Sequence, residues 1–457
     1  MSGLIKGFVG IFRGHSFSLI MLYAATFVMR FAAYIAISLV SYMVDSTPRA
    51  FVIAAYSLFE ILTVSYFGVS SDTKGRRPVL IWSHLLTTIG VALFGIWGFI
   101  QGNTSTGDLT IILVVYVPLM GILGAGAAAK VSSTMTMIAD ESDIETRAQY
   151  MGFFDLATLG GFAAGTAAGH VFHKALNFDN IISFSVAVVA VVISLIMVWL
   201  WVDETLTPEE IAKNQEEGSE ETDFLTRAFK VVKSNKDLQK ILPVYIPMIS
   251  LYGLLIAYAK ELAEDELAAG LTPELIIAGM IVGFTMGLSM LVSGKLSDTK
   301  RVRRPFIIIG LISLALLIIV FRLFSVDAQG TELFGIVFNS TGSFHGLVEH
   351  WYLTAILGFG TGMFPPAILA YLTDISHKDT RGTMFGVYSV IFGTGMIIGP
   401  ILGSFSAEVG KALDADVWGL VGAVVFLVII SCIGTLFLEE KALNHSLVEK
   451  LDIIEEK

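Results

Sequence analysis

Long uninterrupted stretches of apolar residues recur along the whole sequence, and this pattern restricts the chain to very few folds. An α-helix needs about 20 apolar residues to cross the ~30 Å hydrocarbon core of a bilayer. Only 15% of the residues are charged, against about 25% in soluble domains, so a water-soluble fold is disfavoured. Twelve stretches are long enough to span a membrane: residues 16–44, 50–70, 78–100, 109–138, 149–172, 180–202, 241–263, 274–296, 305–326, 350–373, 384–406 and 416–438.

These stretches predict helices rather than the strands of a membrane barrel. Barrel strands are segments of about ten residues in which apolar and polar positions alternate, and the present runs do not alternate. Helices satisfy their backbone hydrogen bonds internally, as a lipid environment requires. One long charged segment divides the predicted spans into two groups of six. We therefore expect an N-terminal six-helix bundle at 1–202, a cytoplasmic loop at 203–240, a C-terminal six-helix bundle at 241–438 and a cytoplasmic tail at 439–457.

The two groups of six spans match each other in sequence. Thr146 and Arg147 recur as Thr380 and Arg381, 234 residues later. The same offset carries three glycines of the fifth span onto three of the eleventh: Gly161, Gly165 and Gly169 onto Gly395, Gly399 and Gly403. Glycine at every fourth position lets one helix approach another closely. The repeat predicts an all-α membrane protein with twelve transmembrane helices in two pseudo-symmetric six-helix bundles.

The distribution of cations predicts the orientation of the chain. With both termini in the cytoplasm, 22 of the 29 Lys and Arg residues lie on the cytoplasmic side, and the outer loops hold three: Arg49, Lys174 and Lys411. This bias obeys the positive-inside rule. We expect a multi-pass protein of the plasma or inner membrane with cytoplasmic N- and C-termini.

A short polar motif follows the second and the eighth spans. Its copies are GVSSDTKGRRP at 68–78 and GKLSDTKRVRRP at 294–305, which is one residue longer. The glycine, the aspartate four residues on and the following Gly-Arg-Arg group resemble the cytoplasmic signature of the major facilitator superfamily, a family of secondary transporters. The resemblance implies the fold described above and a carrier of small solutes that works by alternating access.

The resemblance also implies gating roles for charged residues near this motif. In the family, the Asp and Arg of the motif hold the two halves together on the cytoplasmic side in the outward-open state. We accordingly expect gating residues at Asp72, Arg76, Arg77, Asp298, Arg304, Arg147, Arg381 and Asp155. The alternative, which is open above all for the second copy, is that these charges only orient the helices.

Three ionisable side chains lie near the middle of predicted spans: Arg30, Glu60 and Lys130. A charge at the bilayer centre costs about 2.5–3.5 kcal/mol on insertion scales, so such residues are functional candidates. The fold itself does not require charge there, because Met286 and Phe364 match Glu60 and Lys130 in the second half. Two cations near one carboxylate leave a net positive charge, which predicts an anionic or zwitterionic organic solute.

In the family, spans 1, 4, 7 and 10 line a central cavity. The resemblance therefore makes Arg30 and Lys130 candidate substrate ligands, together with Tyr34, Tyr252 and Tyr258 in spans 1 and 7. Glu60 is the candidate proton carrier, because burial and neighbouring cations change the protonation of a carboxyl in opposite directions. The alternative is a static buried ion triad that stabilises the N-terminal half.

No nucleotide-binding loop, zinc signature or nucleophile motif is found, and the chain has a single cysteine, Cys432. We therefore expect neither an ATP-driven pump nor an enzyme, and no metal or cofactor. The expected partners are a small-molecule substrate, protons and the lipid bilayer, without nucleic acid, for a monomeric protein. Two alternatives stay open: a multidrug efflux protein that exchanges drug for protons, and a non-transporting sensor or scaffold with the same fold.

Overall fold

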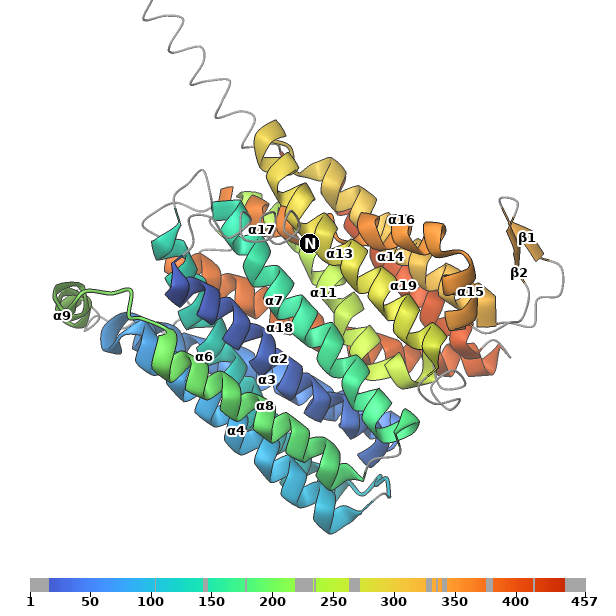
Figure 1. Cartoon of the computed structure of the whole chain (residues 1–457), viewed down its shortest axis with the longest axis horizontal. Coiled ribbons are helices and arrows are strands. Elements are labelled where there is room, and N and C mark those ends of the chain that lie inside the picture. Colours follow the sequence, from blue (N-terminus) through green and yellow to red (C-terminus); the bar gives the residue numbers. More distant parts are fainter. Residues whose placement is uncertain are drawn as a thin grey trace, which may run out of the picture.

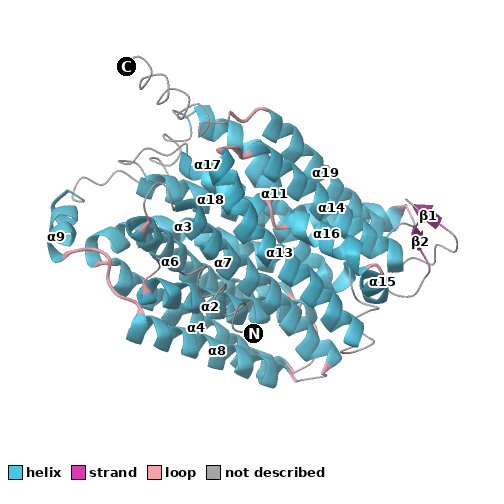
Figure 2. Cartoon of the chain, turned by 45° about the horizontal axis from the view of Figure 1, so that its top comes forward, coloured by secondary structure: helices cyan, strands magenta, loops and turns pink. Residues whose placement is uncertain are grey.

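The structure of the chain is a computed structural model that describes most of the sequence. The described residues are 16–102, 104–142, 147–176, 179–217, 233, 236–262, 272–325, 331–333, 336–338, 343–374, 381–413 and 416–439. Almost all of them are helical, as Figure 2 shows.

The first half of the described chain contributes six long helices. They are α2 (Phe17–Met43), α3 (Ser46–Lys74), α4 (Arg76–Gln101), α6 (Val117–Glu141), α7 (Arg147–His170) and α8 (Asn180–Trp201). The short α5 (Leu109–Ile111) and the π-helical turn η1 (Ile112–Tyr116) lead into α6, and a second π-helical turn, η2 (Val171–Ala175), follows α7.

The second half has the same plan with one broken span. Its elements are α9 (Pro208–Glu217), α11 (Lys236–Leu262), α13 (Pro273–Lys300), α14 (Arg304–Ser325), α15 (Ser343–Glu349), α16 (Trp351–Thr361), α17 (Phe364–Asp374), α18 (Arg381–Ala412) and α19 (Asp416–Leu436). The strands β1 (Thr331–Leu333) and β2 (Ile336–Phe338) pair antiparallel. The hairpin and α9 project on opposite sides of the helical body (Figure 1).

The predicted twelve-helix membrane fold is confirmed. Ten of the described segments are long and apolar enough to cross a bilayer, or eleven if the bent α3 counts as one span, and α7 occupies the remaining position. The tenth span consists of α16 and α17, which the sequence did not separate. Large apolar side chains stay exposed around the outside, for example Trp82, Phe99 and Phe284, and a lipid environment would cover them.

The helices pack into two groups that meet along two seams. In the first group α2 packs on α7 and α8, and α6 packs on α3 and α4. In the second group α11 packs on α18 and α19, and α16 packs on α13 and α14. The seams between the groups are α3 against α18, and α7 against α13 and α17. Figure 1 shows the blue and green helices beside the yellow and red ones.

Glycines set the shortest approaches between these helices. A Cβ added at Gly165 would collide with the backbone carbonyl of Phe31 in α2, and one added at Gly399 would collide with that of Ser250 in α11. A Cβ at Gly124 in α6 would collide with the carbonyl of Tyr56 in α3. The packing role expected of the repeated glycines is thus confirmed, and it fixes where the charged side chains of α2, α3 and α6 can meet.

Helix α9 follows the first six-helix group and begins with a capping box. The Thr207 hydroxyl accepts from the backbone N–H of Glu210 at 3.3 Å, and the Glu210 carboxylate accepts from the backbone N–H of Thr207 at 2.8 Å. The Glu210 carboxylate accepts hydrogen bonds from the backbone N–H and the hydroxyl of Thr207, and because these two bonds favour the ionised form, they hold the pKa of Glu210 below its ordinary value. At the other end of α9, the Asn214 and Gln215 amides donate to the carbonyls of Asp72 and Thr73 at the end of α3. Helix α9 is therefore tied to the first half of the molecule.

Candidate functional site

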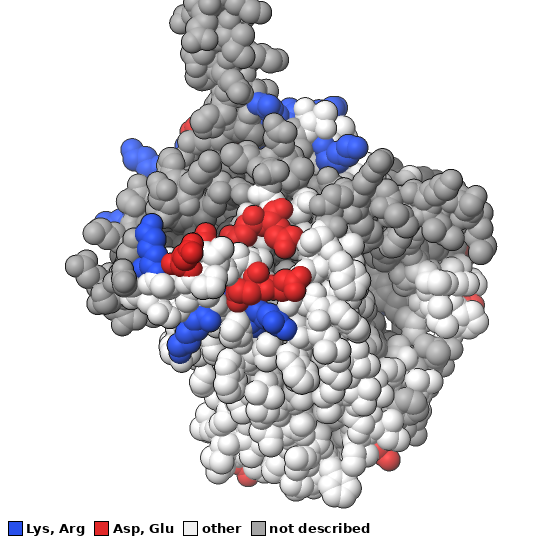
Figure 3. Space-filling model, turned by 60° about the vertical axis from the view of Figure 1, so that its left-hand side comes forward, with Lys and Arg blue, Asp and Glu red and all other residues white. Residues whose placement is uncertain are grey.

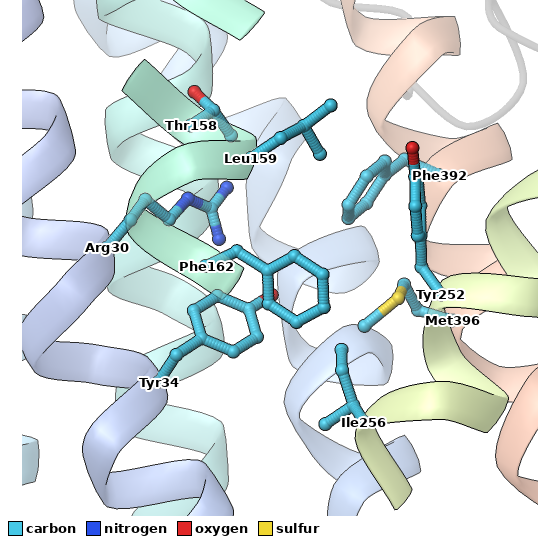
Figure 4. A pocket seen from close by; sticks show the side chains of 9 residues that line it. All are labelled: Arg30, Tyr34, Thr158, Leu159, Phe162, Tyr252, Ile256, Phe392 and Met396. Atoms are coloured by element: carbon cyan, nitrogen blue, oxygen red, sulfur yellow. The ribbon is translucent and has the colours of Figure 1, made fainter. Parts of the chain in front are cut away.

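A small pocket lies at the junction of the two helix groups. Its walls come from α2 and α7 of the first half and from α11 and α18 of the second (Figure 4). The lining residues are Arg30, Tyr34, Thr158, Leu159, Phe162, Tyr252, Ile256, Phe392 and Met396. Arg30 is the charged member of this set, and the rest of the wall is aromatic, aliphatic or weakly polar.

The side chain of Arg30 is held in place from several directions. Its Nη1 donates to the hydroxyl of Tyr56 at 2.9 Å, and its guanidinium carbon lies 5.9 Å from the ring centroid of Tyr34. Gly161 allows α7 to pack against the stem of Arg30, since an added Cβ would lie 2.8 Å from the Arg30 Cβ. In Figure 4 the guanidinium points toward Phe162 and the space between the helices. Arg30 thus presents a fixed positive charge to the pocket.

Glu60 and Lys130 lie behind Arg30 and do not line the pocket. Both are buried, with exposed fractions of 1% and 0%. Glu60 follows Tyr56 by one helical turn of α3, and the charges of Arg30 and Lys130 both act on its carboxyl. The Nζ of Lys130 lies 5.2 Å from the ring centroid of Phe154, on α7. The structure therefore brings the three predicted mid-membrane charges together, with Arg30 alone of the three at the pocket wall.

Asp155 belongs to the same buried group of charges. It lies on α7 with an exposed fraction of 5%, and its carboxyl interacts electrostatically with Lys130. It precedes the pocket residues Thr158 and Leu159 by one turn of the helix. The sequence predicted Asp155 to be a gating residue near the cytoplasmic motif. In the structure its carboxyl instead interacts electrostatically with Lys130.

Aromatic rings form a chain across the pocket from one helix group to the other. The ring centroids of Tyr34 and Phe162 are 4.6 Å apart, those of Phe162 and Tyr252 are 6.1 Å apart, and those of Tyr252 and Phe364 are 6.2 Å apart. Two predicted substrate residues, Tyr34 and Tyr252, therefore lie in one continuous ring contact. The chain offers flat apolar surfaces to a bound ring.

Tyr258, the remaining predicted substrate residue, lies away from the pocket lining. Its ring centroid is 5.8 Å from the guanidinium carbon of Arg49, at the start of α3. Arg49 is 1% exposed, and its Nη1 donates to the carbonyl of Ser41 at 3.1 Å. Arg49 was predicted to lie in an outer loop, and the structure places it in the first turn of α3 with a buried side chain. The Arg49–Tyr258 contact joins α3 to α11 across the junction of the two halves.

The first copy of the polar motif makes a compact set of contacts inside the first half. Arg76 forms an ion pair with Asp140 at the end of α6. The Glu204 carboxylate, which follows α8, accepts from the backbone N–H groups of Arg76 and Arg77 at 3.1 and 3.0 Å. Gly75 has a φ of 98°, which favours glycine, and an added Cβ would lie 2.7 Å from the Glu204 carboxylate. Figure 3 shows charged side chains gathered at this end of the molecule, above a largely uncharged surface.

The two halves repeat one contact at this end. The Nη2 of Arg77, at the start of α4, donates to the carbonyl of Trp199 at the end of α8 at 2.6 Å. The Nη2 of Arg304, at the start of α14, donates to the carbonyl of Leu436 at the end of α19, also at 2.6 Å. Each arginine thus caps the last turn of a helix in its own half. The side chains of Asp298, Arg147 and Arg381 lie outside the described part of the structure.

Replacement of Glu204 by alanine is expected to lower the stability of the protein by about 1–3 kcal/mol. The carboxylate caps the N-terminus of α4, where Gly75 supplies no side-chain cap. Thermal melting in detergent measures the change. The matched control is Glu209→Ala, because Glu209 is exposed in the first turn of α9. Equal melting temperatures for the two variants would contradict a capping role for Glu204.

Sequence reasoning missed several residues of the site. Tyr56 was detectable in principle, because it lies one helical turn before Glu60 and therefore on the same face of the helix. Phe162, Phe392 and Met396 carried no signal, since apolar residues occupy most positions of every span. Glu204 was visible as an acid after the sixth span, without an indication of its partner.

Comparison with protein families gives one family model that matches most of the chain in two overlapping segments. The family model described as Major Facilitator Superfamily matches residues 19–348 and 330–452. These two matched segments together cover the twelve predicted spans except for residues 16–18 of the first.

Comparison with curated proteins gives distant relatives. The chain is 22% identical over 369 residues to multidrug resistance protein 2 of Bacillus subtilis (strain 168), covering 79% of this chain and 80% of the relative. It is 29% identical over 109 residues to quinolone resistance protein NorA of Staphylococcus aureus. That second match covers 22% of this chain and spans only 28% of the length of NorA.

Comparison with solved structures shows the same fold at low sequence identity. A D-xylose–proton symporter has a TM-score of 0.61 at 15% identity, covering 93% of this chain and 99% of the symporter. The human organic anion transporter MFSD10 has a TM-score of 0.57 at 15% identity, covering 92% of this chain and 99% of that transporter.

Proposed function

This chain belongs to the major facilitator superfamily, and from that premise we propose that it is a secondary active transporter of a small organic anion or zwitterion, coupled to protons. The observation that carries this proposal is Arg30, a buried cation fixed at the wall of a pocket between the two helix groups. A buried guanidinium attracts and orients a carboxylate, sulfonate or phosphate group. The aromatic wall opposite suits the apolar body of such a solute.

Alternating access follows from movement of the two helix groups about the pocket. The seams between α3 and α18, and between α7 and α13, lie on either side of the junction where such movement would occur. We place both termini in the cytoplasm and the protein in the plasma membrane, as a monomer. The polar motif with Asp72, Arg76 and Arg77 then faces the cytoplasm, and it controls opening there together with Asp298, Arg304, Arg147 and Arg381.

Glu60 is the proposed proton carrier of the site. Its carboxyl is buried, and the positive charges of Arg30 and Lys130 both act on it. A solute anion bound at Arg30 offsets part of that positive charge, and this changes the tendency of Glu60 to hold a proton. Protonation of Glu60 on one side of the membrane and release on the other would couple the two fluxes.

Replacement of Glu60 by glutamine is expected to abolish accumulation driven by a proton gradient while solute exchange continues. Glutamine keeps the size and the hydrogen-bonding capacity of the side chain but cannot carry a proton. Uptake and counterflow in proteoliposomes measure the two activities separately. Glu408→Gln is the matched control, because Glu408 is exposed at the end of α18. If both activities of the Glu60 variant equal those of the unchanged protein, Glu60 has no coupling role.

Export of lipophilic drugs is a second candidate function. Eight of the nine residues that line the pocket are uncharged, and the curated relatives include proteins named for quinolone resistance and multidrug resistance. Arg30 discriminates between the two candidates, because a guanidinium attracts an anion and repels a cationic drug. Counterflow of an aromatic anion and of a cationic dye into the same vesicles separates them. Saturable binding without any counterflow would instead indicate a non-transporting sensor.

A further inference from the structure

Lys130 is buried in the centre of the first helix group with no charged partner in hydrogen-bonding contact among the described residues. Its exposed fraction is 0%, and its Nζ has no hydrogen-bond acceptor there. An ammonium group removed from water costs several kcal/mol unless nearby negative charge compensates it. That charge comes from two sides, because the carboxyls of Glu60 on α3 and Asp155 on α7 both act on Lys130.

Each of these two carboxyls also has one oxygen that accepts no hydrogen bond from the described residues. The Oε2 of Glu60 and the Oδ2 of Asp155 are buried without a hydrogen-bond donor among the described residues. A buried carboxylate oxygen with no donor is costly, whereas a protonated carboxyl avoids most of that cost. Lys130 therefore stands between two carboxyls, either of which can hold a proton.

The formal charges of this region cancel, whether all four groups are ionised or Lys130 has passed its proton to one of the two carboxyls. Arg30 and Lys130 supply two positive charges, and Glu60 and Asp155 supply two negative charges when both are ionised. Among the described residues, the other titratable neighbours are the phenols of Tyr34 and Tyr56 and the ring of His84 on α4, whose Nδ1 donates to the carbonyl of Leu80 at 2.9 Å. With both phenols and the imidazole neutral, the net charge of the site stays at zero. A bound solute with one negative charge would make the net charge −1, and one proton added to a carboxylate would restore neutrality.

We propose that Lys130 is a shared counter-ion of Glu60 and Asp155, and that this carboxyl pair takes up one proton for each negative charge bound at Arg30, so that transport is electroneutral. The inference rests on the proposed transport of an anion. The proton adds to a carboxylate oxygen of Glu60 or Asp155 from water on one side and leaves to water on the other side. Asp155 acts one helical turn from the pocket residue Thr158, on the helix that packs against α13 and α17 of the other half.

The test uses the full-length protein in proteoliposomes and 2-naphthalenesulfonate as the probe. This anion is flat and aromatic, and its sulfonate stays ionised at neutral pH, so any proton that moves with it is carried by the protein. An inward proton gradient is expected to accumulate the probe by up to about tenfold per pH unit, the ratio that one proton per anion sets. A membrane potential imposed with potassium and valinomycin is expected to leave the rate unchanged.

The variant Asp155→Asn tests the role of the carboxyl pair directly. It leaves two cations and one carboxylate, so the probe itself neutralises the site and no proton is required. Exchange is expected to continue, accumulation on the proton gradient is expected to be lost, and uptake is expected to become sensitive to membrane potential. Asp203→Asn is the control, because Asp203 is exposed and the substitution keeps its backbone N–H, which donates to the Ser18 hydroxyl at 2.8 Å.

The outcomes separate this inference from the proposed function. If the unchanged protein moves no probe in either direction, anion transport itself is refuted. If it moves the probe but the rate follows the membrane potential, or no proton accompanies the probe, the electroneutral scheme is overturned while anion transport stands. The stoichiometry is measured on the unchanged protein, so the test does not depend on correct folding of the Asp155 variant.

Discussion

Replacement of Arg30 by glutamine is expected to weaken the binding of an aromatic monoanion by about 30-fold or more, because loss of one partner of a buried charge pair costs roughly 2–5 kcal/mol. Arg30 is the charged residue of the pocket lining, so in the variant the anion would face aromatic and aliphatic side chains without a counter-charge. Concentration-dependent uptake into proteoliposomes and ligand-induced shifts in melting temperature both measure the change.

Two further variants show whether the loss of affinity comes from the charge and geometry of Arg30 itself. Arg30→Lys keeps the charge but loses the planar donor set, and we expect an intermediate loss of roughly tenfold. Arg322→Gln, in the last turn of α14, removes an arginine outside the pocket lining and should leave affinity unchanged. Unaltered affinity of the Arg30→Gln protein for anions, or tighter binding of cations alone, would favour drug export over anion transport.

Replacement of Gly124 by leucine is expected to prevent accumulation of folded protein, and Gly124→Ala to lower stability by about 1–3 kcal/mol. A Cβ at this position would collide with the backbone carbonyl of Tyr56, and a backbone atom cannot rotate away as a side chain can. Helices α3 and α6 would have to separate where Tyr56 and Glu60 are held. Fluorescence-detected gel filtration and thermal melting measure the two effects.

The matched control for Gly124 is another glycine within a span. Gly283 lies on the exposed side of α13, and a Cβ added there would meet no atom within 4 Å. Gly283→Ala should therefore melt at the temperature of the unchanged protein or slightly higher, since alanine favours the helix. Comparable destabilisation by Gly124→Ala and Gly283→Ala would show that the collision at Tyr56 is relieved at little cost.

The sequence predicted the fold well because the lipid bilayer imposes a simple rule on length and polarity. Every predicted span is occupied by helix in the structure, and the repeated glycines lie where helices touch. The break between α16 and α17 was not predicted, because hydropathy reports the length of an apolar run and not its straightness. It occurs at Gly362, where an added Cβ would collide with the carbonyl of Met286 on α13.

The site was predictable only in part. Charges at Arg30, Glu60 and Lys130 stood out because they are costly in lipid. Which of them reaches the pocket depends on side-chain direction and on neighbouring helices, and neither can be read from one sequence. Lys130 turns toward Phe154 on α7, and Asp155 one residue later in that helix supplies charge to it. Spacing along the chain indicated depth in the membrane but not these partners.

The paired caps at Arg77 and Arg304 have a mechanical consequence. Each arginine ties the first turn of one helix to the last turn of another in the same half, and the ion pair of Arg76 with Asp140 adds a third helix on one side. None of these three contacts crosses the junction between the two halves. In the proposed alternating access, each half tilts as one piece without breaking these contacts, and the contacts that open are among those that cross the junction, such as Arg49 with Tyr258.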